Sequence, residues 1–191
     1  MSHPIDFGSI EEKLFLLQQM ACASKEFSLW KETHTNTEVE EDWQIPEITH
    51  EIDNYFAWMS TFVSNYMIEC ATKTRIFQDH LDEDLYECGV SAFDEGAIKA
   101  VGGDIGKIYV GEFKLSLRES CNKIIHAKKV SFDSLPLNNH NRCWNGICHL
   151  QGEFRKSKWH ISINVRNWAA AMSYYHESLS EQREQFWELE S

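Results

Sequence analysis

A helical repeat of apolar side chains over residues 48–70 constrains this chain more than any other feature of its sequence. Apolar residues recur there at every third or fourth position, and an α-helix gathers residues with that spacing on one face. They are Ile52, Tyr55, Met59, Phe62, Tyr66 and Cys70. The pattern predicts a helix of about 22 to 30 residues whose apolar face must be buried against other elements of the fold.

Weaker helical repeats occur in four other segments of the chain. A capping-box pattern, Ser9 followed by Glu12, marks the start of the first segment. The expected helices cover about residues 9–24, part of 73–100, about 107–128 and about 167–179, the last fading into an acidic tail over about 180–191.

The pattern changes over residues 143–165, where apolar and polar residues alternate in two runs. Alternation with a period of two is typical of a half-buried strand, and the polar stretch Arg155–Lys156–Ser157 separates the runs. The sequence therefore predicts a β-hairpin. The expected fold is mainly α: one domain over residues 1–191, built as a helical bundle with a β-hairpin inserted before its last helix.

Charge is distributed unevenly along the chain. Its 191 residues include 30 Asp and Glu against 18 Lys and Arg, a net charge of −12. This balance disfavours a protein that grips nucleic acid over a broad surface, since phosphate binding needs clustered cations. The acidity is concentrated in residues 38–53, 79–87 and the C-terminal end, whereas the charge turns locally positive between about 114 and 166. A small RNA site in that region remains compatible with the net charge.

The chain carries no targeting or membrane signal that we recognise. Its N-terminus lacks a basic stretch followed by an apolar core, and no run approaches the roughly 18 apolar residues of a membrane span. Six cysteines without a secretory signal are typical of reduced thiols. We expect a cytoplasmic protein that does not bind membranes.

Three polar residues follow one another at helical spacing within the segment 107–128. Arg118, Asn122 and His126 are spaced four positions apart, so successive side chains drift by only about 40° around a helix. The trio suits RNA cleavage: the histidine can transfer a proton near neutral pH, the arginine can stabilise phosphate charge, and the asparagine can orient either group. The alternative is that these residues are solvated or bonded locally at the rim of a bundle.

The segment SLRESCNKIIHA, residues 116–127, resembles the active-site helix of the HEPN superfamily, small helical-bundle proteins that include many metal-independent ribonucleases of toxin–antitoxin and anti-phage systems. His126 matches the family's histidine, and Asn122 matches the polar residue that follows its arginine. The family most often has arginine five positions before the histidine, where this chain has Cys121. The resemblance implies either a metal-independent endoribonuclease in which Arg118 substitutes, or a catalytically degenerate relative. It also implies a homodimer in which two such helices form one cleft, and no cofactor.

Cations near this segment could bind RNA. They are Lys128, Lys129, Arg155, Lys156 and Lys158, with Trp144 and Trp159 as expected stacking partners. The alternative is a solvated hairpin tip.

A second group of candidate ligands lies within ten residues: His140, Cys143, Cys148 and His149. Such side chains can bind zinc, but four residues separate the two cysteines rather than the usual two. A strand here would also direct Cys148 and His149 to opposite faces. We therefore favour a strand entry with buried cysteines and expect no metal.

A different class of function is suggested by the acidity of residues 38–53. The segment 30–47 is polar and contains Pro46, which indicates a loop. An acidic loop could engage a basic protein, as an immunity or inhibitor protein does, without any enzymatic activity. Its acidic residues are Glu38, Glu40, Glu41, Asp42, Glu47, Glu51 and Asp53.

Overall fold

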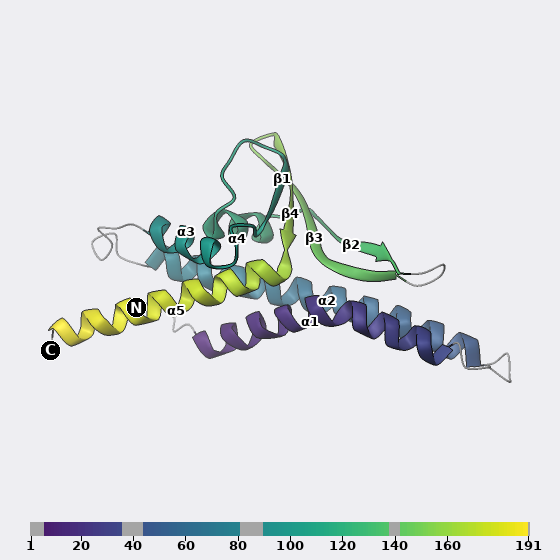
Figure 1. Cartoon of the computed structure of the whole chain (residues 1–191). Coiled ribbons are helices and arrows are strands. Elements are labelled where there is room, and N and C mark those ends of the chain that lie inside the picture. Colours follow the sequence, from purple (N-terminus) through teal and green to yellow (C-terminus); the bar gives the residue numbers. More distant parts are fainter. Residues whose placement is uncertain (1–5, 36–43, 81–89, 138–141, 191) are drawn as a thin grey trace.

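A computed structural model describes residues 6–35, 44–80, 90–137 and 142–190 of the chain. Within these ranges the protein forms five helices and a four-stranded sheet. Figure 1 shows the helices as a lower layer and the sheet standing above it.

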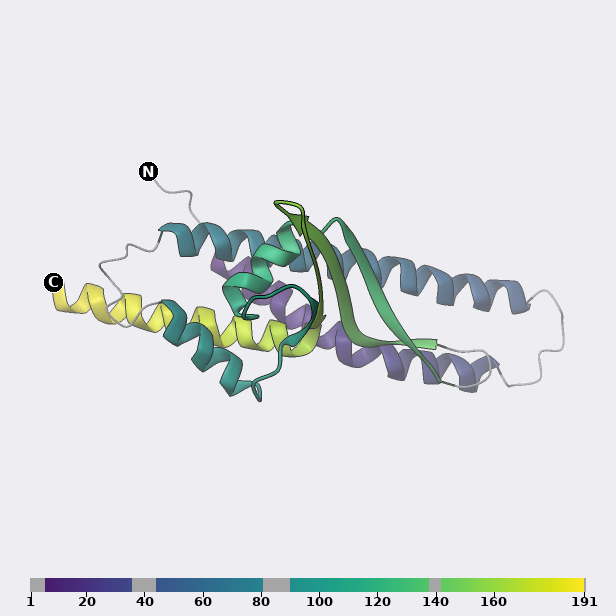
Figure 2. The same cartoon turned by 90° about the horizontal axis from the view of Figure 1, so that it is seen from above.

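Three long helices build the lower layer. Helices α1 (Phe7–Thr35) and α2 (Gln44–His80) run antiparallel, and α5 (Val165–Glu190) packs beside α1. Two short helices lie above them: α3 (Val90–Ala100) packs on α5, and α4 (Leu117–Ile125) packs on α2. Seen from above, the sheet crosses over the long helices near the middle of their length (Figure 2).

The sheet is antiparallel throughout. Its strands are β1 (Gly106–Val110), β2 (Lys129–Pro136), β3 (Arg142–Phe154) and β4 (Ser157–Asn164), in the spatial order β1-β4-β3-β2. The β3–β4 pair is the hairpin that the alternating pattern predicts, and this prediction is confirmed. Its turn lies at the end of the sheet farthest from the long helices (Figure 1).

The hydrophobic core lies between the sheet and the helices. Alternate residues of β3 and β4 point inward, as the period of a strand requires. Helices α1, α4 and α5 pack on them, and α2 packs on α1 and α4. Among the most buried side chains are Leu14, Leu17, Val63, Met67, Cys148, Leu150, Ile161, Ile163, Trp168 and Met172. Trp144 also lies between the sheet and the helices, where its indole N–H donates to the backbone oxygen of Ile147 at 2.8 Å.

Buried polar contacts fix the start of α4. The Ser116 hydroxyl accepts from the backbone N–H of Glu119 at 3.1 Å, which is a standard N-cap. Both carboxylate oxygens of Asp94 accept from backbone N–H groups of the first turn, from Leu117 at 2.8 Å and from Arg118 at 3.0 Å. A carboxylate at this position accepts hydrogen bonds from N–H groups that the helix itself leaves unpaired. Its negative charge also interacts favourably with the positive N-terminal end of the helix dipole.

The fold corrects several predictions made from local patterns. It is a mixed α/β fold dominated by helices, rather than a helical bundle with one hairpin. The helix expected over 107–128 is wrong: a strand and a loop occupy its first half, because residues 106–110 pair with β4. Strand β2 was not anticipated. The helical spacing of apolar residues across 110–121 is a coincidence, because these residues belong to β1, the following loop and α4.

Helix lengths also differ from expectation. Helix α1 continues to Thr35, and α2 begins at Gln44, so Pro46 lies in its first turn, where proline is tolerated. Residues 30–47 are therefore not one loop. The acidic tail over 180–191 is the continuation of α5 to Glu190. Of the region 73–100, residues 81–89 lie outside the described ranges.

Candidate nucleic-acid interface

The two faces of the sheet differ in what covers them. The inner face packs on α1, α4 and α5. On the outward face, no helix of the described ranges is packed, and the residues of adjacent strands form cross-strand rows. One row runs Lys107–Ser162–His149–Ser131, and the next runs His160–Gln151–Lys129.

An aromatic cluster occupies the middle of the outward face. The ring of Tyr109 stacks on His160 with 4.7 Å between centroids and 23° between planes, and it lies 5.7 Å from His149. The Nδ1 atom of His149 lies 3.2 Å from Nε2 of His160, so one ring donates a hydrogen bond to the other. Partial burial and the neighbouring His149 lower the pKa of His160. Tyr109 nevertheless remains 54% exposed, which leaves one of its faces open to a ligand.

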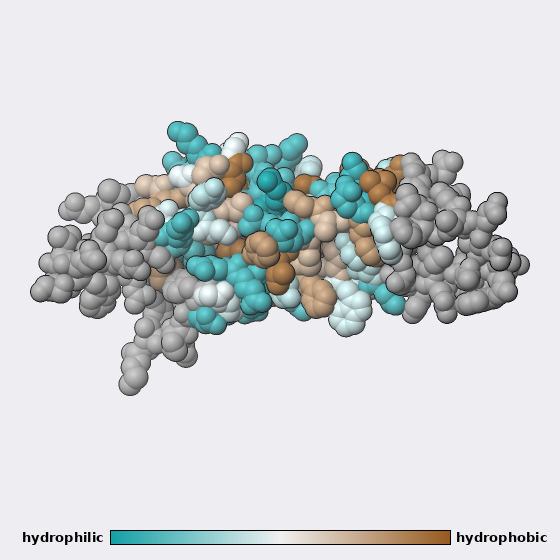
Figure 3. All heavy atoms as spheres, turned by 60° about the horizontal axis from the view of Figure 1, so that its bottom comes forward, coloured by the Kyte–Doolittle hydropathy of each residue, from teal (hydrophilic) through white to brown (hydrophobic). Residues whose placement is uncertain are grey.

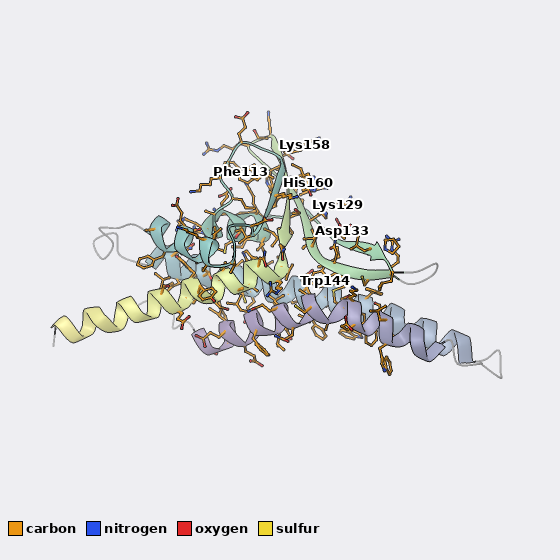
Figure 4. All side chains as sticks on the ribbon, viewed as in Figure 1. Phe113, Lys129, Asp133, Trp144, Lys158 and His160 are labelled. Carbon is orange, nitrogen blue, oxygen red and sulfur yellow. The ribbon has the colours of Figure 1, made fainter. Side chains whose placement is uncertain are left out.

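Cations surround this cluster. Lys107, Lys129 and Lys158 all lie on the outward face and are exposed, and within the described residues none of them pairs with a carboxylate. Figure 4 shows His160 and Lys129 along the sheet, with Lys158 near its tip. Residues 106–166 contain 11 Lys and Arg against 4 Asp and Glu, a net charge of 11 − 4 = +7. The rest of the chain therefore carries −12 − 7 = −19, so the segment that forms the sheet and α4 is the cationic part of an acidic protein.

The structure gathers the five cations expected to bind RNA at one end of the sheet. Arg155 and Lys156 form the β3–β4 turn, with backbone φ angles of 48° and 71°. Lys129 pairs across the strands with Gln151, and Lys158 with Glu153. Lys128 differs from the other four because its charge is paired: its ammonium group lies 3.2 Å from the Glu153 carboxylate.

The expected stacking partners are wrong. Trp144 is 2% exposed and Trp159 is 5% exposed, so both indoles belong to the core. On the outward face the aromatic rings are instead those of Tyr109, His149 and His160, which the sequence did not group. Phe154, 66% exposed, lies at the end of β3 beside the turn. The alternation of β4 that buries Trp159 and Ile161 also directs His160 outward, so the outward position of His160 can be predicted from the sequence. The contact of Tyr109 with His160 cannot be predicted in this way, since it depends on the pairing of β1 with β4.

Two members of the Arg118–Asn122–His126 trio are engaged with α2. The guanidinium of Arg118 lies 2.9 Å from a carboxylate oxygen of Asp79. The side-chain oxygen of Asn122 accepts from Nε of Arg75 at 2.9 Å, and its amide donates to Glu119 at 3.0 Å. Arg75 also bonds Asp79 and Gln78. The arginine and the asparagine thus form part of a polar network that joins α4 to α2.

His126 lies apart from that network. It is the C-cap residue of α4, exposed, and its side chain has no hydrogen bond or ion pair to any residue that the structure describes. It lies eight positions after Arg118, a rise of about 12 Å along a helix. It immediately precedes Ala127 and the Lys128–Lys129 pair, and the N–H of Lys128 donates to the backbone oxygen of Gln151 at 2.8 Å. The histidine therefore adjoins the cationic end of the sheet rather than forming a tight trio with Arg118.

The cysteine and histidine candidates divide between the two faces of β3. Cys148 is buried in the core, and burial raises its thiol pKa to about 12, whereas His149 faces outward. Cys143 is buried too, and His140 lies outside the described ranges. Within the described part of the chain, no three His, Cys, Asp or Glu side chains are grouped to hold a metal ion.

The acidic segment 38–53 falls largely beyond what the structure describes. Residues 36–43 lie outside the described ranges, and residues 44–53 belong to the first turns of α2 rather than to a loop.

Comparison with known proteins places no relative beside this chain: no protein-family model, curated protein or solved structure matches it. None of the helices in the described residues combines the length and the apolar character of a membrane-spanning helix.

Proposed function

We propose that this protein binds single-stranded RNA on the outward face of its sheet. The observation that carries the proposal is the Tyr109–His160–His149 cluster, whose tyrosine is exposed, on a domain that is otherwise acidic. The lysines around it pair with no carboxylate of the described residues. Unpaired bases can stack on Tyr109, because every base has a π-face, and single strands splay their bases outward as duplexes do not.

The lysines supply the second half of the interaction. Lys107 and Lys129 lie on opposite sides of the aromatic cluster, on the two edge strands, and Lys158 lies toward the tip. A strand that stacks a base on Tyr109 can therefore place flanking phosphates near cations on both sides. Phosphate contacts release counterions, so binding should weaken steeply as salt rises. The acidic helical layer limits the footprint to the sheet.

The test is fluorescence anisotropy with a short fluorescein-labelled single-stranded RNA, titrated at several salt concentrations. The double variant Lys107→Glu/Lys129→Glu should bind at least about tenfold more weakly and show a shallower salt dependence. The matched control is Lys25→Glu/Lys99→Glu, which makes the same charge change at exposed positions of α1 and α3. Equal losses in the two variants would mean that total charge, not the sheet, governs binding. Absence of binding by the wild type would reject the proposal.

RNA cleavage is a second candidate function, favoured by the position of His126. Its side chain is exposed beside the cationic end of the sheet, where a bound phosphodiester could reach it. In this reaction His126 would accept the proton of a ribose 2′-hydroxyl as that oxygen attacks the adjacent phosphate. The bond from phosphorus to the 5′-oxygen would break, leaving a 2′,3′-cyclic phosphate, and the departing 5′-oxygen would take a proton from water. Arg118 would have to leave Asp79 to reach the same phosphate. The HEPN resemblance, and with it a role in toxin–antitoxin or anti-phage systems, remains a prediction.

Cleavage is tested by incubating RNA with the protein in EDTA. Loss of cleavage in His126→Ala, with RNA binding retained, would support the catalytic role. Cleavage that survives this substitution would reject it, and a wild type that binds RNA without cutting it would be a binding protein or a degenerate relative.

A further inference from the structure

The turn between β3 and β4 carries a largely uncovered aromatic ring. Phe154, the last residue of β3, has the largest exposed fraction of the large apolar side chains in the described ranges. By the alternation of the strand it shares a face with the buried Leu150, but the turn lies at the end of the sheet farthest from the long helices (Figure 1). The guanidinium of Arg155 lies over the ring, 5.2 Å from its centroid. The tip of the hairpin therefore combines a flat apolar surface with a cation.

The backbone of this turn is strained. Arg155 and Lys156 have φ angles of 48° and 71°, and Phe154 pairs with Ser157, so the turn consists of two residues that are both left-handed. Such turns normally contain Asn-Gly or Asp-Gly, because few other residues adopt this conformation without cost. Strain of this kind is typical of sites that use it for binding or catalysis. The turn thus holds two long cations where smaller residues would fold more easily.

Exposed apolar residues elsewhere have different surroundings. Phe15 and Trp58 lie on the long helices, and the side of the helical layer turned away from the sheet mixes hydrophobic with hydrophilic residues (Figure 3). Single apolar residues on such a surface are ordinary. Phe154 differs because exposed cations surround it, and none of Arg155, Lys156 and Lys158 pairs with a carboxylate of the described residues. A ring among cations suits a ligand that is both flat and negatively charged.

We infer that this hairpin tip, formed by Phe154, Arg155, Lys156 and Lys158, binds the end of an RNA duplex, so that the protein recognises the junction of single-stranded with double-stranded RNA. The inference rests on the proposed function, because the single-stranded arm lies on the outward face of the sheet. The terminal base pair of the duplex stacks on Phe154, since it is the one pair with a free π-face. The phosphates of its two strands lie near cations on either side of the tip.

The spacing along the hairpin fits such a junction. His160, on which Tyr109 stacks, pairs with Gln151, and Phe154 lies three residues farther along β3, about 10 Å away. A strand with one base on Tyr109 therefore reaches the tip within a few nucleotides.

Charge also favours the tip as the place for a duplex. A duplex carries phosphates on two strands, so the acidic helical layer repels it more strongly than it repels a single strand. Phe154 lies four residues beyond the buried Leu150, about 13 Å along the strand, whereas charges are largely screened beyond about 8 Å at physiological salt. A duplex that begins at the tip and points away from the molecule avoids most of this repulsion.

The first test compares labelled RNAs by fluorescence anisotropy: a single strand, and the same strand extended by a stem-loop at its 5′ end or at its 3′ end. One of the two junction RNAs should bind at least about fivefold more tightly than the single strand. Phe154→Ala should abolish this difference and leave affinity for the single strand unchanged, whereas Phe154→Trp should retain it. Phe15→Ala, at another exposed phenylalanine, is the matched control and should change neither.

Failure of the inference can be told apart from failure of the proposed function. A wild type that binds the single strand but shows no preference for either junction RNA would overturn the inference alone. A wild type that binds none of the RNAs would reject both. If Phe154→Ala instead lowers binding to vesicles of phosphatidylserine and phosphatidylcholine, with no junction preference in the wild type, the tip contacts membranes and the inference is wrong.

The second test uses the strained turn. Arg155→Asn/Lys156→Gly installs residues that accept left-handed backbone, so the variant should melt at a higher temperature than the wild type. It also removes two cations and should weaken binding of the preferred junction RNA by at least about fivefold. Lys25→Gln/Lys99→Gln removes two exposed cations from α1 and α3 and should keep the junction preference. A melting temperature that does not rise, or junction affinity that falls no further than in this control, would count against the inference.

Discussion

The two faces of strand β4 differ in their surroundings, although their residues alternate along the same strand. Trp159 and Ile161 are buried against the helices, whereas His160, between them, lies outward beside Tyr109. The same division runs through β3, where Cys148 and Leu150 point inward and His149 points outward. The inner face should control stability and the outward face binding, and substitutions on the two faces should separate these properties.

The largest effect is expected from truncation on the inner face. Ile161 is fully buried, and Ile161→Ala should lower the free energy of unfolding by about 2–5 kcal/mol through lost burial and a residual cavity. Urea denaturation measures this change. The protein that remains folded should bind RNA as the wild type does. His160→Ala on the adjacent outward position is the matched control and should change stability little, since only its exposed ring contacts are lost.

A buried histidine should make the stability of the protein depend on pH. His176 on α5 is 3% exposed and lies 2.9 Å from the Thr74 hydroxyl, and burial lowers its pKa to about 4. Because the unfolded chain takes up this proton near pH 6.5, the native state has its full stability above that pH. It loses about 3 kcal/mol as the pH falls toward 4.

The comparison of wild type with His176→Gln isolates this contribution from the carboxylates. Unfolding free energies measured across this range should diverge between the two proteins, with the steeper decline in the wild type. Parallel curves would show that His176 is protonated equally in the folded and unfolded states.

A moderate effect is expected from the outward aromatic ring. Tyr109→Ala should weaken RNA binding by about 1–2 kcal/mol through the loss of one stacked base, with unfolding nearly unchanged. Tyr109→Phe keeps the π-face and should restore most of the affinity in anisotropy titrations. Failure of the phenylalanine to restore binding would indicate that the hydroxyl, not the ring face, contacts the RNA.

The smallest effect concerns protonation of His160, whose ring lies against His149. Burial and its neighbour lower the pKa of His160, so the ring is neutral at physiological pH. As the pH falls through the lowered pKa of His160, that ring gains positive charge beside Tyr109, and RNA affinity should rise by about two- to fivefold. The rise should be absent in His149→Gln/His160→Gln. A flat pH profile in the wild type would exclude a contribution of these rings to phosphate binding.

Regular local patterns predicted much of this fold. The helical stripe on α2 and the β3–β4 hairpin follow from periodicity, because each is long enough to show its period clearly. The short edge strands β1 and β2 escaped detection. Strand β1 has five residues and is held by pairing with β4, far along the chain, rather than by its own pattern. Strand β2 has eight residues and pairs with β3, the next strand in the sequence.

The candidate site divides in the same way. The sequence located the cations at 128–129 and 155–158, and the alternation of each strand determined which side chains share a face. Only the tertiary structure brought Tyr109 onto His160, drew Arg118 and Asn122 into contacts with α2, and left one face of the sheet uncovered. The physical reason is that periodicity sets the direction of a side chain relative to its own helix or strand. What that side chain meets is decided by segments that lie tens of residues away.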